Sequence, residues 1–285
     1  MLDTTYFAPS TLEEAVDYYR KNPEVILFAG GTDLLVGLEY GKVKIENFLD
    51  LTNVEELNYI CINGNGVKIG AMTTINSVEE NPQIISKYPF LADAASKLGS
   101  WQIRNTATVG GNICNGAPSA ELTPPLLVLD SKVTVIGPDG ERTLPLNDFL
   151  VGPGKTALYE GEILKEIEVP ALPEKAVGVY MCHKWRKSMD VAIANLAVFL
   201  VLDGDEIKEA RVCLGAVGPT AFRASETEKV LLGNVLKEDV IIKASETAAS
   251  EAKPITDVRA SADYRRRMIS VCMKRALTNL QNKEV

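Results

Sequence analysis

The chain has 285 residues, of which 46% are hydrophobic and 24% are charged, the composition of an ordinary globular protein. This length accommodates one large domain or two domains of common size, and we expect two. The formal net charge of −8 argues against a nucleic-acid partner, because phosphates require a clustered basic face. The dense basic run from Arg265 to Arg267 is predicted to be a solvated helix face.

The first part of the chain predicts many short strands and a few helices. Ser10 and Glu13 stand three positions apart ahead of helically spaced apolar residues, which predicts a capping box and a helix. Residues 24–29 are typical of a buried strand. Further strands are expected at 47–51, 57–62, 66–72, 132–137, 142–146 and 162–170, and helices at 90–100 and 121–130. This mixture is an α+β pattern, without the strict strand–helix alternation of a parallel doubly wound sheet.

The composition changes at residues 169–178, where Pro170 and Pro173 lie in a short polar link. We therefore expect one domain over residues 1–172 and a second over residues 173–285. Beyond the link, two long strands are predicted to be joined through Asp203-Gly204, a hairpin dipeptide flanked by hydrophobic runs. Helical patterns follow at 224–233, 237–252 and 262–281. The C-terminal part is thus predicted to be a small antiparallel sheet backed by helices.

Neither a secretion signal nor a membrane span is expected. The first residues, MLDTTYFAPS, are acidic and aromatic and lack a basic start with an apolar run. The longest apolar stretch, 191–202, is interrupted by Asn195 and is too short to span a bilayer. The chain has five cysteines, an odd number at wide spacing, which favours reduced thiols in the cytoplasm and gives no metal-ligand pattern.

Two glycine pairs indicate a binding function. One lies in FAGGTDLL, residues 28–35, and the other in TVGGNICNGAPSAEL, residues 108–122. Adjacent glycines can adopt positive φ and point successive N–H groups into one concavity, which binds an anion without any side chain. A tight turn is the competing interpretation of each pair. Because Thr32, Thr108 and Asn112 flank the pairs, we predict that both grip one diphosphate from two sides.

The sequence does not contain the motifs of two other kinds of nucleotide-binding site. The sequence has no G-x-G-x-x-G after a strand, which argues against a Rossmann site. The segment FLVGPGKT, residues 149–156, ends like a P-loop, but Phe149 occupies the position of the first glycine. Pro153 also removes an amide that the phosphates would need. We expect a loop with a surface lysine there.

Two titratable residues have alternative interpretations. His183 is the single histidine, which excludes a multi-histidine metal site, and we expect it to be a partly buried strand residue rather than a catalytic base. Glu121 precedes an apolar helix. It is either a first-turn carboxylate favoured by the helix dipole or an acceptor of hydrogen bonds from a ribose.

With these residues in view, the chain resembles the FAD-binding (medium) subunit of the molybdenum hydroxylases, the group of xanthine, carbon monoxide and nicotinate dehydrogenases. Residues 28–35 and 99–122 look like that family's two FAD loops, in the right order and separation. The segments 161–164, 186–195 and 257–268 also match, so the resemblance covers nearly the whole chain. It implies a two-part FAD domain of the p-cresol methylhydroxylase type, followed by a small α/β domain.

Carried over position by position, the resemblance implies a set of FAD-binding residues and no catalytic or metal-ligating ones. Ile103 would lie beside the isoalloxazine, Glu121 near the ribose, and Leu164 in the cofactor pocket. Several relatives have a lysine where this chain has Cys182, so Lys184, two positions on, is the remaining candidate for that contact. The residues implied to wrap the pyrophosphate are Leu27, Phe28, Ala29, Gly30, Gly31, Thr32, Asp33, Leu34, Thr108, Val109, Gly110, Gly111 and Asn112.

The resemblance also implies an electron-transfer role. A flavin takes electrons singly from iron–sulfur clusters and passes two onward, chemistry that belongs to the cofactor. The partners would be a small iron–sulfur subunit and a large molybdopterin subunit in a hetero-oligomer, with NAD or another acceptor. A xanthine dehydrogenase-like enzyme is our expectation, and a nicotinate, carbon monoxide or aldehyde dehydrogenase is the alternative. From another class, a non-redox regulatory protein that binds a nucleotide would also fit the loops alone.

Overall fold

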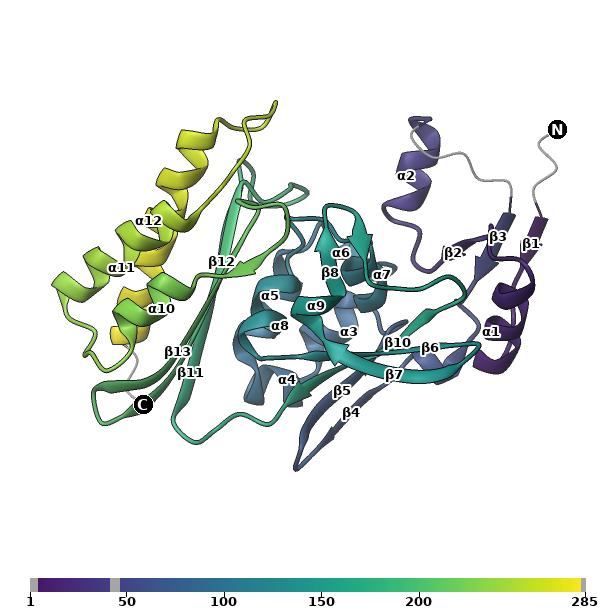
Figure 1. Ribbon diagram of the computed structural model, residues 1–285, viewed down its shortest axis with the longest axis horizontal. Coiled ribbons are helices and arrows are strands. Elements are labelled where there is room, and N and C mark those ends of the chain that lie inside the picture. The colour runs from purple at the N-terminus through teal and green to yellow at the C-terminus, as the bar shows by residue number, and fades with distance from the viewer. Residues whose placement is uncertain (1–4, 42–46, 283–285) are drawn as a thin grey trace.

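The computed structural model describes residues 5–41 and 47–282. Three regions follow one another along the chain and across the molecule (Figure 1). An N-terminal region with a small parallel sheet adjoins a central region with an antiparallel sheet and short helices. The C-terminal region is a second antiparallel sheet covered by long helices. The predicted α+β class is confirmed.

The N-terminal region pairs its strands in the order β1-β3-β2, with both pairs parallel. Its elements are β1 (Thr5–Phe7), α1 (Leu12–Lys21), β2 (Ile26–Phe28), α2 (Leu34–Glu39) and β3 (Asn47–Asp50). Parallel neighbours need crossover connections, and the helices lie in those connections. The N-cap of α1 is Thr11, whose hydroxyl accepts from the Glu14 amide at 3.2 Å. The cap predicted at Ser10 and Glu13 is therefore one residue too early, because two adjacent hydroxyl residues competed for the position.

The central sheet has the strand order β4-β5-β10-β6-β7 and is antiparallel throughout. Its strands are β4 (Ile60–Asn63), β5 (Gly66–Gly70), β6 (Lys132–Gly137), β7 (Gly140–Pro145) and β10 (Ile163–Pro170). Side chains alternate between the two faces. Ile69 and Ile167 are paired and buried in the core, whereas Lys68 donates to Glu166 at 2.7 Å on the other face.

Short helices and a hairpin surround this sheet. They are η1 (Glu55–Leu57), α3 (Ile75–Glu80), α4 (Pro82–Lys87), α5 (Pro89–Lys97), α6 (Trp101–Arg104), α7 (Val109–Cys114), α8 (Thr123–Val128), α9 (Leu146–Phe149), β8 (Leu150–Gly152) and β9 (Lys155–Thr156). The β8–β9 hairpin contains the P-loop-like segment, and Lys155 is exposed on it, so the predicted surface loop is confirmed. The Gly154 amide donates to the Gly116 carbonyl at 3.0 Å.

The C-terminal sheet has the order β11-β12-β13-β14, again antiparallel. The elements of this region are β11 (Ala176–His183), β12 (Ala194–Asp203), β13 (Glu206–Gly215), β14 (Phe222–Arg223), α10 (Ser225–Leu231), α11 (Glu238–Glu251) and α12 (Ala262–Gln281). The two long strands turn at Gly204, whose φ is +60°, as the Asp-Gly dipeptide predicted. A sheet backed by helices is thereby confirmed. Of strand β11, directly after the proline link, the sequence predicted only the strand residue His183, at its end.

Both faces of the C-terminal sheet are buried. Phe199 of β12 packs in the core shared with the central helices, and α5 and α8 contact this sheet. Val198, its neighbour in the strand, packs in the other core, and α12 contacts the sheet on that side. A strand buried on both faces carries apolar residues without alternation, which explains the continuous apolar run of β12.

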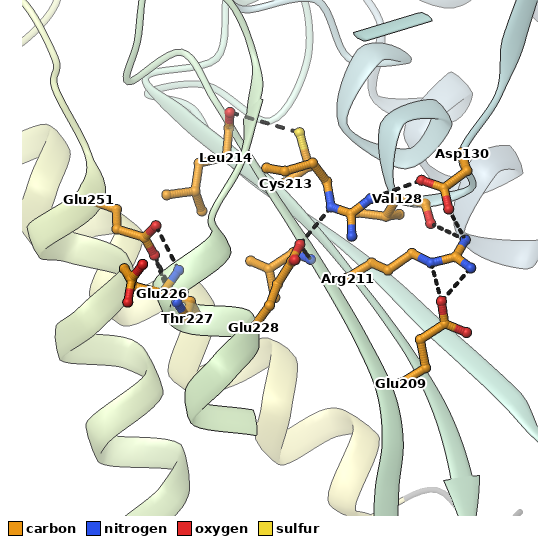
Figure 2. Close-up of polar contacts among 12 residues, drawn as sticks. Val128, Asp130, Glu209, Arg211, Cys213, Leu214, Glu226, Thr227, Glu228 and Glu251 are labelled. Carbon is orange, nitrogen blue, oxygen red and sulfur yellow. Dashed lines mark hydrogen bonds and ion pairs between the residues drawn. The ribbon is translucent and has the colours of Figure 1, made fainter. Parts of the chain in front are cut away.

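Polar contacts also join the central and C-terminal regions. Asp130, just after α8, pairs with Arg211 of β13 at 2.9 Å and with Arg223 of β14 at 2.9 Å. Figure 2 shows Asp130 beside Arg211, which also reaches Glu209. The carboxylate comes from the central region, and both guanidinium groups come from the C-terminal region. These ion pairs therefore join the two regions in addition to their apolar contact.

The basic run of α12 differs from its prediction. Arg265 is buried and donates to the Ile193 carbonyl at 2.7 Å and to Asp257 at 2.8 Å. Arg266 is half-buried, and Arg267 is exposed. The prediction of a solvated position is thus wrong for Arg265. The fold brings the carbonyl of Ile193, 72 residues away in sequence, to its guanidinium group. Within residues 5–41 and 47–282, no helix combines the length and apolar character needed to cross a membrane.

Candidate functional site

A cleft of about 800 Å³ lies where the three regions meet. One wall comes from residues 27–37, which end β2 and begin α2. A second wall comes from residues 98–121, around α6 and α7. The third comes from residues 186–191, the loop after β11. We call residues 29–34 the first glycine loop and residues 108–112 the second glycine loop.

The first glycine loop lines this cleft and contains unpaired backbone amides. The amides of Gly30, Gly31, Thr32 and Asp33 have no hydrogen-bond partner in the part of the chain that the structure describes. Gly31 has a φ of +66°, as predicted. Asp33 is the N-cap of α2, but its side chain accepts no bond from the helix. Consecutive free amides around a positive-φ glycine form a concavity suited to an anion.

The second glycine loop is built differently, and the predicted nest of bare amides is wrong there. Thr108 is the N-cap of α7, so both glycines lie in a helical turn without positive φ. The Gly110 amide donates to the Ala71 carbonyl at 2.8 Å, and the Gly111 amide donates to Thr108 Oγ1 at 3.0 Å. What this loop offers the cleft is a side chain, since Asn112 Oδ1 is buried without a partner among the described residues.

Most of the predicted binding residues line the cleft. These are Leu27, Ala29, Gly30, Gly31, Thr32, Asp33, Leu34, Ile103, Thr108, Gly111, Asn112 and Glu121. Others lie behind the lining. Val109, Gly110 and Leu164 are buried in the protein, and Phe28 packs edge-on against Phe48 with ring centroids 5.9 Å apart.

Glu121 reaches the cleft from a position just outside a helix. Helix α8 has Leu122 as its N-cap, so Glu121 is not a first-turn carboxylate, and that interpretation is wrong. Its side chain is only 10% exposed, and Lys184 donates to its Oε1 at 2.8 Å. Burial raises the pKa of Glu121, whereas the charge of Lys184 acts to lower it. Lys184 contacts this carboxylate but does not itself line the cleft.

The third wall was not predicted residue by residue. Arg186, Met189, Asp190 and Val191 line the cleft from the loop after β11. Met189 has a φ of +50°, and its amide donates to the Gly99 carbonyl of the second wall at 3.2 Å. A positive φ at a methionine is unusual and cannot be read from the residue type. The feature of the sequence that could have indicated this wall was the resemblance of residues 186–195 to the family.

Two further titratable residues, His183 and Cys114, differ in their relation to the cleft. His183 ends β11, where its Nε2 lies 3.0 Å from the Tyr264 hydroxyl, and burial lowers its pKa. It is the partly buried strand residue that was expected. Cys114 lines the cleft, but burial raises the pKa of its thiol to about 12. No group of three or more His, Cys, Asp or Glu side chains within residues 5–41 and 47–282 is arranged to hold a metal ion.

Matches to two families of flavoprotein domains identify the class of this chain. Residues 2–172 match the family described as the FAD binding domain in molybdopterin dehydrogenase. Residues 180–280 match the CO dehydrogenase flavoprotein C-terminal domain. The chain therefore belongs to the FAD-binding medium subunits of the molybdenum hydroxylases.

Individual relatives agree with this assignment. The chain is 33% identical over 276 residues to the xanthine dehydrogenase FAD-binding subunit of Escherichia coli O157:H7, covering 96% of this chain and 94% of the relative. It is 33% identical to the carbon monoxide dehydrogenase medium chain of Hydrogenophaga pseudoflava, over 95% of each. The solved structure of reconstituted CO dehydrogenase from Oligotropha carboxidovorans superposes with a TM-score of 0.94 at 29% identity, covering 99% and 98% of the two chains. The predicted fold is confirmed.

Proposed function

We propose that this FAD-binding subunit relays electrons from the iron–sulfur clusters of a small partner subunit to NAD or another acceptor. The observation that carries the proposal is the row of free amides from Gly30 to Asp33, which faces a cleft in a chain of an FAD-binding family. When bound, FAD supplies the exchange of single electrons on one side and electron pairs on the other.

The cleft residues fit the cofactor in four ways. The amides of Gly30 to Asp33 would hold the diphosphate, and the unpaired Asn112 Oδ1 would accept from a cofactor donor. Glu121 would accept from a ribose hydroxyl, and Ile103 would pack beside the flavin ring. The other residues implied by the resemblance, including Phe28, Val109, Gly110 and Leu164, would support the loops from behind.

The other components of the enzyme are proposed from the family. The relatives carry names of subunits or medium chains, which supports a hetero-oligomer with a small iron–sulfur subunit and a large molybdopterin subunit. The large subunit would set the substrate. We place xanthine first on its frequency in the family alone, because the identity of 33% is the same for the xanthine and carbon monoxide dehydrogenase relatives. Carbon monoxide, nicotinate and aldehyde dehydrogenases are the alternative assignments, with relatives at 33%, 31% and 31% identity.

Two further expectations stay proposals. A domain boundary between residues 172 and 173 is supported by the family matches, which end at 172 and resume at 180. A cytoplasmic location is supported by the cysteines, because all five are free thiols.

The visible absorption spectrum of the purified full chain, followed by cofactor extraction, tests the proposal. We expect bound FAD that bleaches on reduction. A colourless chain that cannot be reconstituted with FAD would overturn it. In the assembled complex, substrate should reduce the flavin, and measured turnover with NAD decides the acceptor. If the complex turned over with a dye or ferredoxin but not with NAD, we would conclude that the acceptor is not NAD.

A further inference from the structure

Besides lining the cleft with residues 186–191, the C-terminal region contacts a cleft residue, Glu121, through the buried ammonium group of Lys184. This residue follows β11, and its side chain is 9% exposed. Its Nζ donates to Glu121 Oε1 at 2.8 Å and to the carbonyl of Lys97, the last residue of α5. The last carbonyls of a helix carry partial negative charge, so both acceptors attract the ammonium. Lys184 is therefore held between a helix end and the cleft wall.

This arrangement leaves the carboxylate of Glu121 able to accept from a ligand. Lys184 donates to Oε1, and within the described ranges the other donor to the carboxylate is the backbone amide of Glu121 itself, whereas a carboxylate has about four acceptor positions. Glu121 lines the cleft, whereas Lys184 does not. A buried ion pair adds little to stability compared with apolar packing, so stability alone is a weak reason for placing one here. The ion pair is better explained by a need to hold the Glu121 carboxylate in one orientation at the wall of the cleft.

We propose that Lys184 is a positioning residue for FAD, which fixes Glu121 as an ionised acceptor facing the cleft without itself touching the cofactor. The inference rests on the proposed FAD function and deepens it. The FAD site would then depend on the C-terminal region, because that region supplies the cation that orients an acceptor of the central region.

The electrostatics around Glu121 give the proposal a pH signature. Burial raises the pKa of Glu121, and Lys184 is the cation that opposes this shift. Tyr180 and Cys182 of β11 also face the carboxylate, but burial raises the pKa of Tyr180 well above its ordinary value and that of Cys182 to about 12. Neither therefore ionises near neutral pH. Without Lys184, only the hydrogen bond from the backbone amide of Glu121 would oppose the effect of burial, and Glu121 would bind a proton at higher pH than in the wild type.

The test is the dissociation constant of FAD for the full chain freed of cofactor, measured from mildly acidic to mildly alkaline pH. In Lys184→Met we expect binding to weaken about 10- to 100-fold at mildly acidic pH, the loss of one charged hydrogen-bond acceptor. Binding should recover in part as pH rises and Glu121 ionises. Lys184→Arg should restore most of the affinity. A purely structural loss would be the same at every pH.

Two further variants separate the explanations. Lys68→Met is the matched control, since Lys68 pairs at 2.7 Å with Glu166, which is also buried but lines no part of the cleft. It should bind FAD like the wild type. In Glu121→Gln, affinity should fall without the pH dependence, and adding Lys184→Met should cause no further loss, because no carboxylate remains to be positioned.

The outcomes distinguish this inference from the proposed function. A wild-type chain that takes up no FAD contradicts the proposed function itself. A wild type that binds FAD, together with a Lys184→Met variant that binds it equally well at every pH, overturns only the positioning role. Fully additive losses in the double variant would overturn it as well, because Lys184 would then act on FAD directly.

Discussion

The two glycine loops look alike in sequence and differ in structure. In the first, the amides of Gly30 to Asp33 have no partner among the described residues, and these residues line the cleft. In the second, the Gly110 amide binds the Ala71 carbonyl and the Gly111 amide binds Thr108. A glycine pair can therefore serve either to expose backbone donors or to let two segments approach closely. The second loop shows only the second use, whereas the first loop combines both, because a Cβ at Gly30 would lie 2.0 Å from the backbone oxygen of Thr106.

The position of the threonine decides between these uses. Thr108 precedes its pair and caps a helix, so its hydroxyl accepts from the amide three residues on. Thr32 follows its pair, and the helix after it begins without a side-chain cap. The hydroxyl before the second pair thus accepts a hydrogen bond from one of the glycine amides. The hydroxyl after the first pair does not, so those amides stay available to a ligand.

The largest effect on FAD is expected for Gly30→Ala. A Cβ at this position would lie 2.0 Å from the backbone oxygen of Thr106. Because backbone cannot rotate away as a side chain can, the first glycine loop would have to shift from the second wall. We expect FAD affinity to fall roughly a hundredfold, the equivalent of a clash of about 3 kcal/mol. The FAD content of the purified full chain measures it, and full occupancy would contradict the assigned role of this loop.

Gly110→Ala should damage the fold instead. Its Cβ would lie 2.7 Å from both the Cβ and the carbonyl oxygen of Ala71. We expect a loss of about 1–3 kcal/mol in the free energy of unfolding, with FAD bound normally by the folded fraction. Denaturant unfolding and FAD titration on one preparation check this. Normal unfolding with lost FAD would instead show that the second pair binds the cofactor through its backbone.

Gly31→Ala is expected to be milder than Gly30→Ala. The added Cβ meets the ring of Phe28 at 2.6 Å, a side chain that can move, and the φ of +66° costs alanine about 1–2 kcal/mol. We expect about tenfold weaker FAD binding. Gly204→Ala is the control, because Gly204 has a φ of +60° and open space around it in the β12–β13 turn. If both variants lost FAD equally, the effect of Gly31→Ala would be general strain.

The smallest effect is expected for Gly111→Ala. This glycine is helical, and the atom close to an added Cβ is Thr108 Oγ1, at 2.9 Å. Alanine favours the helix by about 1 kcal/mol over glycine, which offsets that short contact. Unfolding free energy and FAD affinity should both stay near the wild-type values. A large loss of FAD with normal stability would mean that the cofactor approaches this backbone too closely for a methyl group.

The sequence patterns predicted the long elements and the two loops, but not the third wall of the cleft. The Asp203-Gly204 turn and the C-terminal helices follow from local patterns, and the structure contains them. Met189 reaches the cleft only because β11 pairs with β12 and its amide binds the Gly99 carbonyl. Arg265 looks like a surface residue until the Ile193 carbonyl is brought to it. Such features depend on contacts between distant segments, which no local pattern carries.

The hairpin that resembles a P-loop has a consequence for how the chain can vary in length. Surface hairpins usually tolerate insertions. Here the Gly154 amide binds the Gly116 carbonyl at 3.0 Å, and a Cβ on Gly116 would lie only 3.0 Å from the Lys155 nitrogen. The neighbours of Gly116, Asn115 and Ala117, line the cleft. An insertion after Gly154 would therefore push on the cofactor wall, so additional residues are compatible with the site only on the outer side of the turn, around Pro153.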